Sequence, residues 1–141
     1  CINMGNSHSE VLDVEHFYRD DGSIEAEWPV LNGVRHGNMR IYYKSGNLRS
    51  IVPYVHGIKH GIEREYYDWI VHKLLMKCSY INGVKHGIKY RYDVEGKLIE
   101  YHCYFRGDLQ SSHELRPDQA SFGVIDRLEI RYHKIKCKIF K

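Results

Sequence analysis

The stretch Asn32-Gly33-Val34-Arg35-His36-Gly37 returns twice, as His56-Gly57-Ile58-Lys59-His60-Gly61 and as Asn82-Gly83-Val84-Lys85-His86-Gly87. The first glycines of the three copies are 24 and 26 residues apart. A recurrence at a fixed spacing of this size is typical of repeat architectures, in which each repeat is one small supersecondary unit. This spacing therefore predicts a repeat architecture for the chain.

Hydrophobic and aromatic positions recur in the same register as the glycines. Branched aliphatic residues stand nine positions before these glycines and before Gly107, at Ile24, Leu48, Leu74 and Leu98. Tyrosines stand three positions before the last three of these glycines, at Tyr54, Tyr80 and Tyr104. The register thus predicts four units. The last unit has lost its His-Gly pair, as expected at the end of an array.

Local sequence signals within each unit favour strands. Residues 40–44 are rich in β-forming side chains, Ser45-Gly46-Asn47 is a turn cluster, and residues 48–55 form a second such run. This order is the pattern of a β-hairpin. The glycines of the connecting segments are expected to adopt positive φ angles. No segment has sustained helical periodicity, and residues 112–121 allow one helical turn at most. We predict an all-β chain, an antiparallel meander of successive hairpins in a single-layer twisted repeat sheet.

These residues resemble the MORN-repeat family, and in particular its variant MORN form. The resemblance rests on the Tyr-rich strands, the Asn-Gly turns and the three Gly-x-x-His-Gly segments in register, and it covers residues 14–110. It implies a twisted hairpin array that serves in protein interaction or dimerisation. It also implies two alternatives, an antitoxin-like protein and a structural component of giant-virus particles. We expect a flexible N-terminal segment (1–13), the array (14–110) and a C-terminal cap with a basic strand (111–141).

Length and composition restrict the class of protein. A chain of 141 residues is expected to form one domain. The sequence has no run of about 18 apolar residues, so we expect no transmembrane helix. We also expect no secretory signal at the N-terminus. The four cysteines have no short spacing, which favours separate reduced thiols in an intracellular protein. The alternatives for location are membrane association and a virus particle.

The charges are distributed unevenly although the net charge is only +3. Residues 10–27 are acidic, whereas the C-terminal stretch carries a basic set: Arg131, Lys134, Lys136 and Lys138. Apolar residues alternate with these lysines, which predicts a half-buried strand with a cationic face. One interpretation is an edge strand that lysines protect from aggregation. The others are contact with an anionic lipid surface, an acidic partner or the acidic N-terminal segment of another copy.

Residues that could carry chemistry do not form a recognisable catalytic or metal-binding set. Equivalent positions of successive hairpins lie about 10 Å apart, too far for His36, His60 and His86 to share one zinc ion. We expect these rings to pack on the neighbouring turn and to bond its backbone. Glu63, Glu65 and Asp68 are close in sequence, but a flat sheet offers them no cleft, so we expect solvated carboxylates. We therefore predict no enzyme, no metal, no cofactor and no small-molecule substrate, and we do not expect nucleic acid as a partner.

Two features lie outside the regular repeat pattern and suggest contacts. Met4-Gly5-Asn6-Ser7-His8-Ser9 fits the N-myristoylation pattern, with Gly5 as the acceptor if Met4 is the true start. The third unit contains an insertion that includes Trp69, Ile70 and Val71, in a loop that interrupts the period. Trp is enriched at interface hot spots, so these three residues are candidate partner contacts. The alternative is that Trp69 folds back over the sheet as a lid.

The function that we expect is a non-catalytic repeat scaffold, which binds a protein partner or forms a homo-oligomer. A peripheral membrane adaptor is the first alternative, anchored by an acyl chain on Gly5 together with the basic C-terminal strand. The antitoxin-like and virion roles are the second, and they follow from the family resemblance alone.

Overall fold

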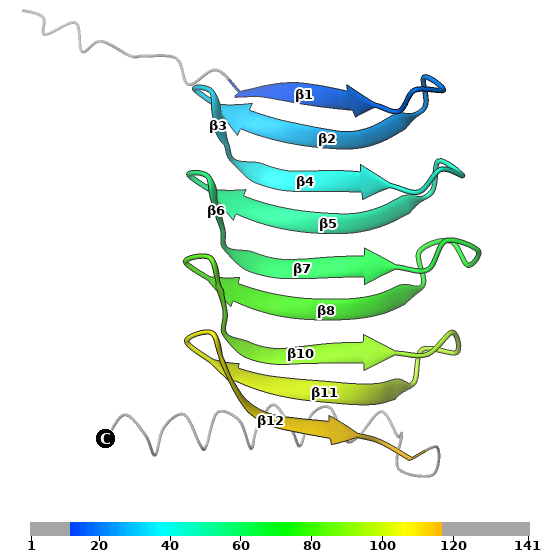
Figure 1. Ribbon diagram of the computed structural model, residues 1–141, viewed down its shortest axis with the longest axis vertical. Helices are drawn as coiled ribbons and strands as arrows, with labels where there is room; N and C mark the ends of the chain where they lie inside the picture. Colours follow the sequence, from blue (N-terminus) through cyan, green and yellow to red (C-terminus); the bar gives the residue numbers. More distant parts are fainter. Residues whose placement is uncertain (1–11, 117–141) are drawn as a thin grey trace, which may run out of the picture.

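The computed structural model describes residues 12–116, which form one open sheet of twelve antiparallel strands (Figure 1). The strands are β1 (Leu12–Tyr18), β2 (Ile24–Leu31), β3 (Val34–Arg35), β4 (Gly37–Tyr42), β5 (Leu48–Val55), β6 (Ile58–Lys59), β7 (Gly61–Tyr66), β8 (Leu74–Ile81), β9 (Val84–Lys85), β10 (Gly87–Tyr92), β11 (Leu98–Phe105) and β12 (Asp108–Glu114). The described range contains no helix. Residues 112–114 belong to β12, which is within the limit of one helical turn at most that the sequence set for residues 112–121.

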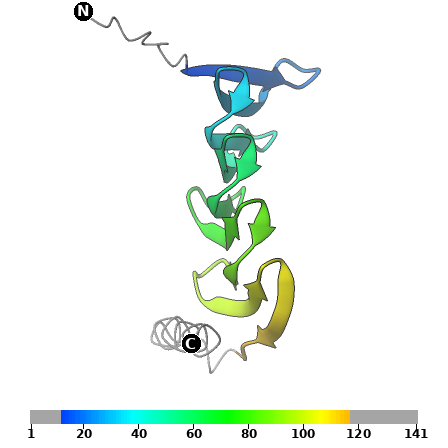
Figure 2. The same ribbon diagram turned by 90° about the vertical axis from the view of Figure 1, so that its left-hand side faces the viewer.

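The strands follow one another across the sheet in the order β1-β2-β4-β5-β7-β8-β10-β11-β12. Neighbours in the sheet are therefore neighbours in the chain, and the predicted antiparallel meander of hairpins is confirmed. Seen from the side, the hairpins stack in a single column, one layer thick (Figure 2). Regular strands extend from Leu12 to Glu114, slightly beyond the range of 14–110 expected for the array.

One end of the sheet carries the loops of the four long hairpins, and we call it the hairpin-loop end. The aliphatic residues of the repeat start the second strand of each hairpin and lie opposite tyrosines, in the pairs Tyr18–Ile24, Tyr42–Leu48, Tyr66–Leu74 and Tyr92–Leu98. A β-bulge precedes every one of these pairs. Bulges increase the local strand twist, so their recurrence contributes to the regular curvature of the stack.

The opposite end carries the Gly-x-x-His-Gly segments, and we call it the histidine-turn end. Each segment turns back as a two-residue strand on the preceding long strand, and then crosses to the next hairpin. The turn residue before each first glycine has a positive φ angle, at 51° for Asn32, 48° for His56 and 49° for Asn82. Asparagine tolerates this conformation better than most residues, which explains the Asn-Gly pairs in the sequence.

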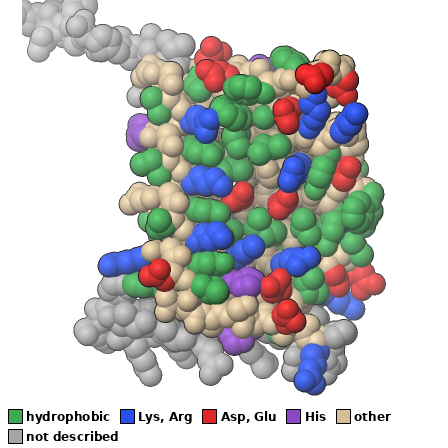
Figure 3. All heavy atoms as spheres, viewed as in Figure 1, with side chains coloured by type: hydrophobic (Ala, Val, Ile, Leu, Met, Phe, Trp, Pro, Cys, Tyr) green, Lys and Arg blue, Asp and Glu red, His purple; other side chains and the backbone are tan. Residues whose placement is uncertain are grey.

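The two faces of the sheet differ in what they bury. We call the face seen in Figure 3 the front face. The cross-strand pairs place on one face a set of small and medium buried side chains in the middle of the strands: Ala26, Met39, Ser50, Val52 and Cys78. A separate cluster of large buried residues occupies the fourth unit: Ile88, Tyr90, Tyr92, Leu98 and Tyr101. The buried cluster of large side chains therefore lies in β10 and β11, whereas every residue of β1 is exposed.

Candidate interaction surfaces

The three repeat histidines serve as backbone acceptors at the junctions between units. The Nδ1 atom of His36 accepts a hydrogen bond from the N–H of His56 at 3.3 Å, and His60 accepts one from Asn82 at 3.3 Å. His86 does the same for Arg106 at 3.4 Å. Each ring therefore bonds the backbone of the next turn, which is the structural role expected from the sequence. Within residues 12–116, no three His, Cys, Asp or Glu side chains are placed to hold a metal ion.

The same turns place a glycine against an apolar side chain of the preceding turn. The N–H of Gly57 donates to the carbonyl of Arg35, and a Cβ on Gly57 would lie 3.2 Å from Val34. Gly83 makes the same two contacts. Its N–H donates to the carbonyl of Lys59, and a Cβ on Gly83 would lie 3.2 Å from Ile58. The turns thus bond and pack against one another along the whole histidine-turn end.

Basic and aromatic side chains form a ladder on the front face, next to the histidine turns. The guanidinium carbon of Arg35 lies 3.6 Å from the ring centroid of Trp28 and 5.7 Å from that of Tyr54. The Lys59 ammonium lies 4.9 Å from the Tyr80 ring, and the Lys85 ammonium lies 4.9 Å from the Tyr104 ring. Figure 3 shows Lys and Arg side chains alternating with hydrophobic ones along the stack on this face of the sheet. Each cation attracts the aromatic face of the next unit, so the ladder joins consecutive repeats.

The hairpin-loop end has its own series of contacts between units. The residue after the first strand of one hairpin donates a hydrogen bond to the backbone of the next hairpin. Tyr43 Oη donates to the carbonyl of Tyr66 at 2.8 Å, and Tyr67 Oη donates to the carbonyl of Tyr92 at 2.9 Å. In the first unit Arg19 takes this place and donates to the carbonyl of Tyr42. Every junction between long hairpins is consequently fixed at both ends of the strands.

The insertion enlarges the third hairpin loop and exposes its tryptophan. This loop closes between Tyr67 and Lys73, whereas the loop of the second hairpin closes between Tyr43 and Asn47. Trp69 is 74% exposed and Val71 is 60% exposed, so the alternative of a lid over the sheet does not hold. Ile70 is half-buried. The Trp69 ring lies beside the ring of Tyr67, with 5.4 Å between the centroids.

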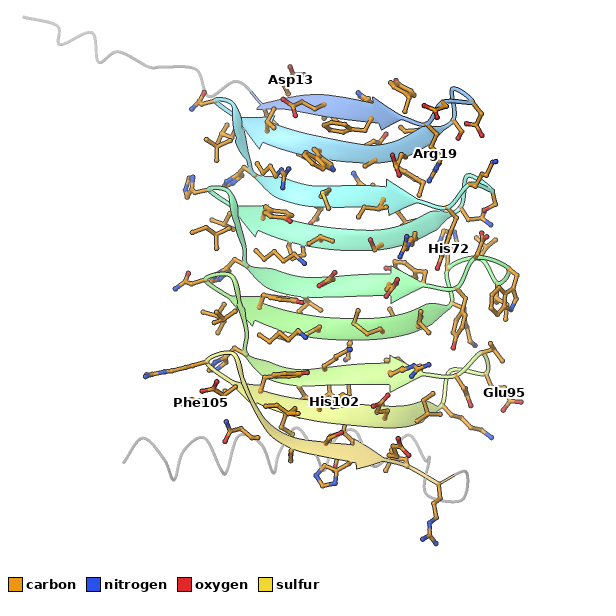
Figure 4. All side chains as sticks on the ribbon, in the orientation of Figure 1. Asp13, Arg19, His72, Glu95, His102 and Phe105 are labelled. Atoms are coloured by element: carbon orange, nitrogen blue, oxygen red, sulfur yellow. The ribbon has the colours of Figure 1, made fainter. Side chains whose placement is uncertain are left out.

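The base of the insertion is held against the neighbouring hairpin loop. The carboxylate of Asp68 accepts hydrogen bonds from Ser45 Oγ and from Asn47 Nδ2, and the Asp68 carbonyl accepts a second bond from the same amide at 2.8 Å. His72, labelled in Figure 4, has a positive φ of 63°. The loop therefore presents Trp69 from a fixed base, at the same end of the sheet as Arg19 and Glu95 (Figure 4).

The acidic residues of the third unit are not solvated as the sequence suggested. The side chain of Glu63 is only 17% exposed and lies 3.4 Å from the Lys59 ammonium, and Glu65 lies 3.6 Å from Arg49. Asp68 is half-buried and hydrogen-bonded in the hairpin-loop contacts. The sequence interpretation missed that front-face glutamates meet the cations of adjacent strands. Each carboxylate is engaged in an ion pair or a hydrogen bond, so the three do not converge as an acid–base set.

Two cysteines lie within the described range, and both are free thiols. Cys78 pairs with Glu63 on the front face, whereas Cys103 pairs with Ile88 on the back face, so the two sulfurs face opposite sides. Burial raises the pKa of the Cys78 thiol, and the charge of Lys85 opposes this only in part. A thiol that holds its proton is a poor nucleophile.

The front face also contains a histidine–carboxylate pair in the fourth unit. The Nε2 atom of His102 lies 2.6 Å from Glu100, whose carboxylate is also 3.4 Å from Arg91. Burial alone would raise the pKa of Glu100, but the hydrogen bond and charge of His102, with those of Arg91, lower it on balance. Arg91, Glu100 and His102 form a compact polar cluster within the ladder region. In the contacts described, no other acid or nucleophile reaches this cluster.

We expect the protein to lose stability in alkali because of the half-buried Tyr42. Burial, together with the hydrogen bond from Tyr42 Oη to Glu27 at 2.7 Å, raises the pKa of Tyr42 from 10.0 to about 12. The folded state holds this proton more tightly than the unfolded state, so its contribution is complete below pH 10 and is lost toward pH 12. Urea midpoints measured across this range should fall less steeply for Tyr42→Phe than for the unmodified protein. Equal slopes would contradict the assignment.

Several residues singled out in the sequence lie outside the described range. These are the lipidation candidate Gly5 and the basic set Arg131, Lys134, Lys136 and Lys138. Within residues 12–116, no helix is long and apolar enough to cross a membrane. Comparisons with models of protein families, with curated proteins and with solved structures gave no match to this chain. Fold and side-chain geometry alone therefore support the functional interpretation.

Proposed function

We propose that this protein is a non-catalytic, MORN-like repeat scaffold that binds another protein or a second copy of itself. The observation that carries the proposal is the insertion, which holds a largely exposed Trp69 on a hydrogen-bonded base. An exposed tryptophan contributes a large contact area to an interface at a small entropic cost. A regular sheet whose inserted loop, within residues 12–116, presents such a residue is suited to presenting a contact.

The junction contacts support a scaffold role by a second route. Three kinds of contact recur between units: the histidine acceptors, the cation–aromatic ladder and the tyrosine bonds of the hairpin-loop end. In repeat proteins, interactions between neighbouring units stiffen the array and keep its surface extended. On the front face these contacts engage Arg35, Lys59 and Lys85. We assign binding to the loops and the outer strands.

Trp69→Ala is expected to weaken partner binding at least tenfold, because loss of a central interface tryptophan removes about 2 kcal/mol or more. The partner is recovered by chemical crosslinking in the native source, and its affinity is then measured by calorimetry with purified proteins. The matched control is Val94→Ala, which removes an exposed apolar side chain from the next hairpin loop. Thermal melting of both variants establishes that they remain folded. Unchanged affinity in folded Trp69→Ala would contradict the proposal for this loop.

A further inference from the structure

Strand β1 is an open edge of the sheet and is unlike the opposite outer strand. Within the described range it pairs with β2 alone, and all seven of its residues are exposed. Its sequence alternates apolar and acidic residues from Leu12 to Glu15, and Phe17 and Tyr18 follow. In contrast, β12 carries a single large apolar residue, Leu109, among polar ones. An exposed edge with apolar residues is a template for strand addition.

The acidic side chains of β1 stand at this edge without a basic partner among the described residues. The N–H of Val14 donates to the carboxylate of Asp13 at 2.7 Å, so this carboxylate lies against the backbone of its own strand. Figure 4 shows Asp13 on the outermost strand. Asp13 and Glu15 lie on the same side of the sheet, since side chains alternate along a strand. The edge therefore presents two carboxylates on one face and two aliphatic residues, Leu12 and Val14, on the other.

A segment of this same chain has the complementary pattern. Lys134-Ile135-Lys136-Cys137-Lys138-Ile139 lies outside the described range, and its sequence alternates lysines with apolar residues. In an antiparallel pairing with Val14 opposite Cys137, Asp13 would face Lys138 and Glu15 would face Lys136. The same register sets Leu12 opposite Ile139. A shift by one residue would set lysines against the aliphatic residues, whereas a shift by two would keep lysines opposite the carboxylates, so the alternation excludes odd shifts of register.

We infer that β1 is a docking edge for residues 134–139 of a second copy of this chain. This inference rests on the proposed scaffold function and names its partner. Two β1 strands would pair poorly with each other, because both carry carboxylates at the edge. The outer strands β1 and β12 lie about 38 Å apart across eight strand spacings, and the basic segment follows β12 in the chain. Docking on a neighbouring copy thus joins the far end of one array to the near end of the next.

The test is a charge exchange between two variants of the full chain. The edge variant carries Asp13→Lys and Glu15→Lys, and the tail variant carries Lys136→Glu and Lys138→Glu. Each variant alone sets like charges opposite each other, so self-association measured by sedimentation velocity should weaken about tenfold. In an equimolar mixture, each tail meets an edge of opposite charge, and association should return.

The control variant is Asp20→Lys with Glu95→Lys, which makes within hairpin loops the same change in net charge as the edge variant. It should associate like the unmodified chain. If the edge and tail variants associate as strongly as the control, the edge assignment is overturned and the general scaffold proposal stands. A mixture that stays dissociated, or an unmodified chain that is monomeric throughout, also overturns the assignment. The Trp69 experiment remains a separate test of the scaffold in all three cases.

Discussion

Gly61→Ala is expected to lower the free energy of unfolding by about 2–3 kcal/mol, through backbone strain and a close contact with Pro53 together. Gly61 begins β7 with a φ of 118°, a conformation that residues with a Cβ rarely adopt. An added Cβ would also lie 3.1 Å from Pro53 Cγ, and the proline ring has little freedom to move away. Chemical denaturation of the purified variant measures the loss.

Gly33→Ala is the matched control for this substitution. Gly33 also has a positive φ, of 80°, but an added Cβ there would meet nothing within 4 Å. It should lose only about 1 kcal/mol, the cost of the backbone conformation without the contact. Equal losses in the two variants would show that the close packing of the histidine turn on Pro53 does not contribute to stability.

Leu98→Ala is expected to cost about 2–4 kcal/mol, because it leaves a cavity in the buried cluster of large side chains in the fourth unit. Leu98 is 4% exposed and belongs to the cluster of the fourth unit with Tyr92 and Tyr101. Leu48 holds the same position in the second unit but is only half-buried, so Leu48→Ala should cost clearly less. Urea unfolding of both variants compares the two units directly. A larger loss for Leu48→Ala would contradict the assignment of the main core to the fourth unit.

The regular part of the fold was predictable from the sequence because the glycine spacing and the strand patterns agree. The positive φ of Gly33 and the cross-strand pairing of Tyr42 with Leu48 are local consequences of turn and hairpin chemistry. The structural role of the repeat histidines was predictable for a similar reason. Strand spacing places equivalent side chains too far apart to share an ion, which leaves bonding to the next turn.

The contacts between units were harder to anticipate. Lys59 and Tyr80 both recur in register, but they are far apart in sequence, and only the folded sheet brings the ammonium over the ring. The burial of Glu63 beside Lys59 escaped prediction because a flat sheet was expected to leave its carboxylates in water. The exposure of Trp69 was also undecided, since loop length alone does not determine whether a ring points outward.

The central claim is that this repeat sheet works by associating with protein, and light scattering of the full chain measures this most directly. We predict a molar mass above that of one chain at micromolar concentration, rising with protein concentration. It also predicts that high salt lowers the mass, because docking at β1 depends on opposite charges that salt screens. The mass of a single chain at every concentration, with no protein retained from the native source, would contradict the account.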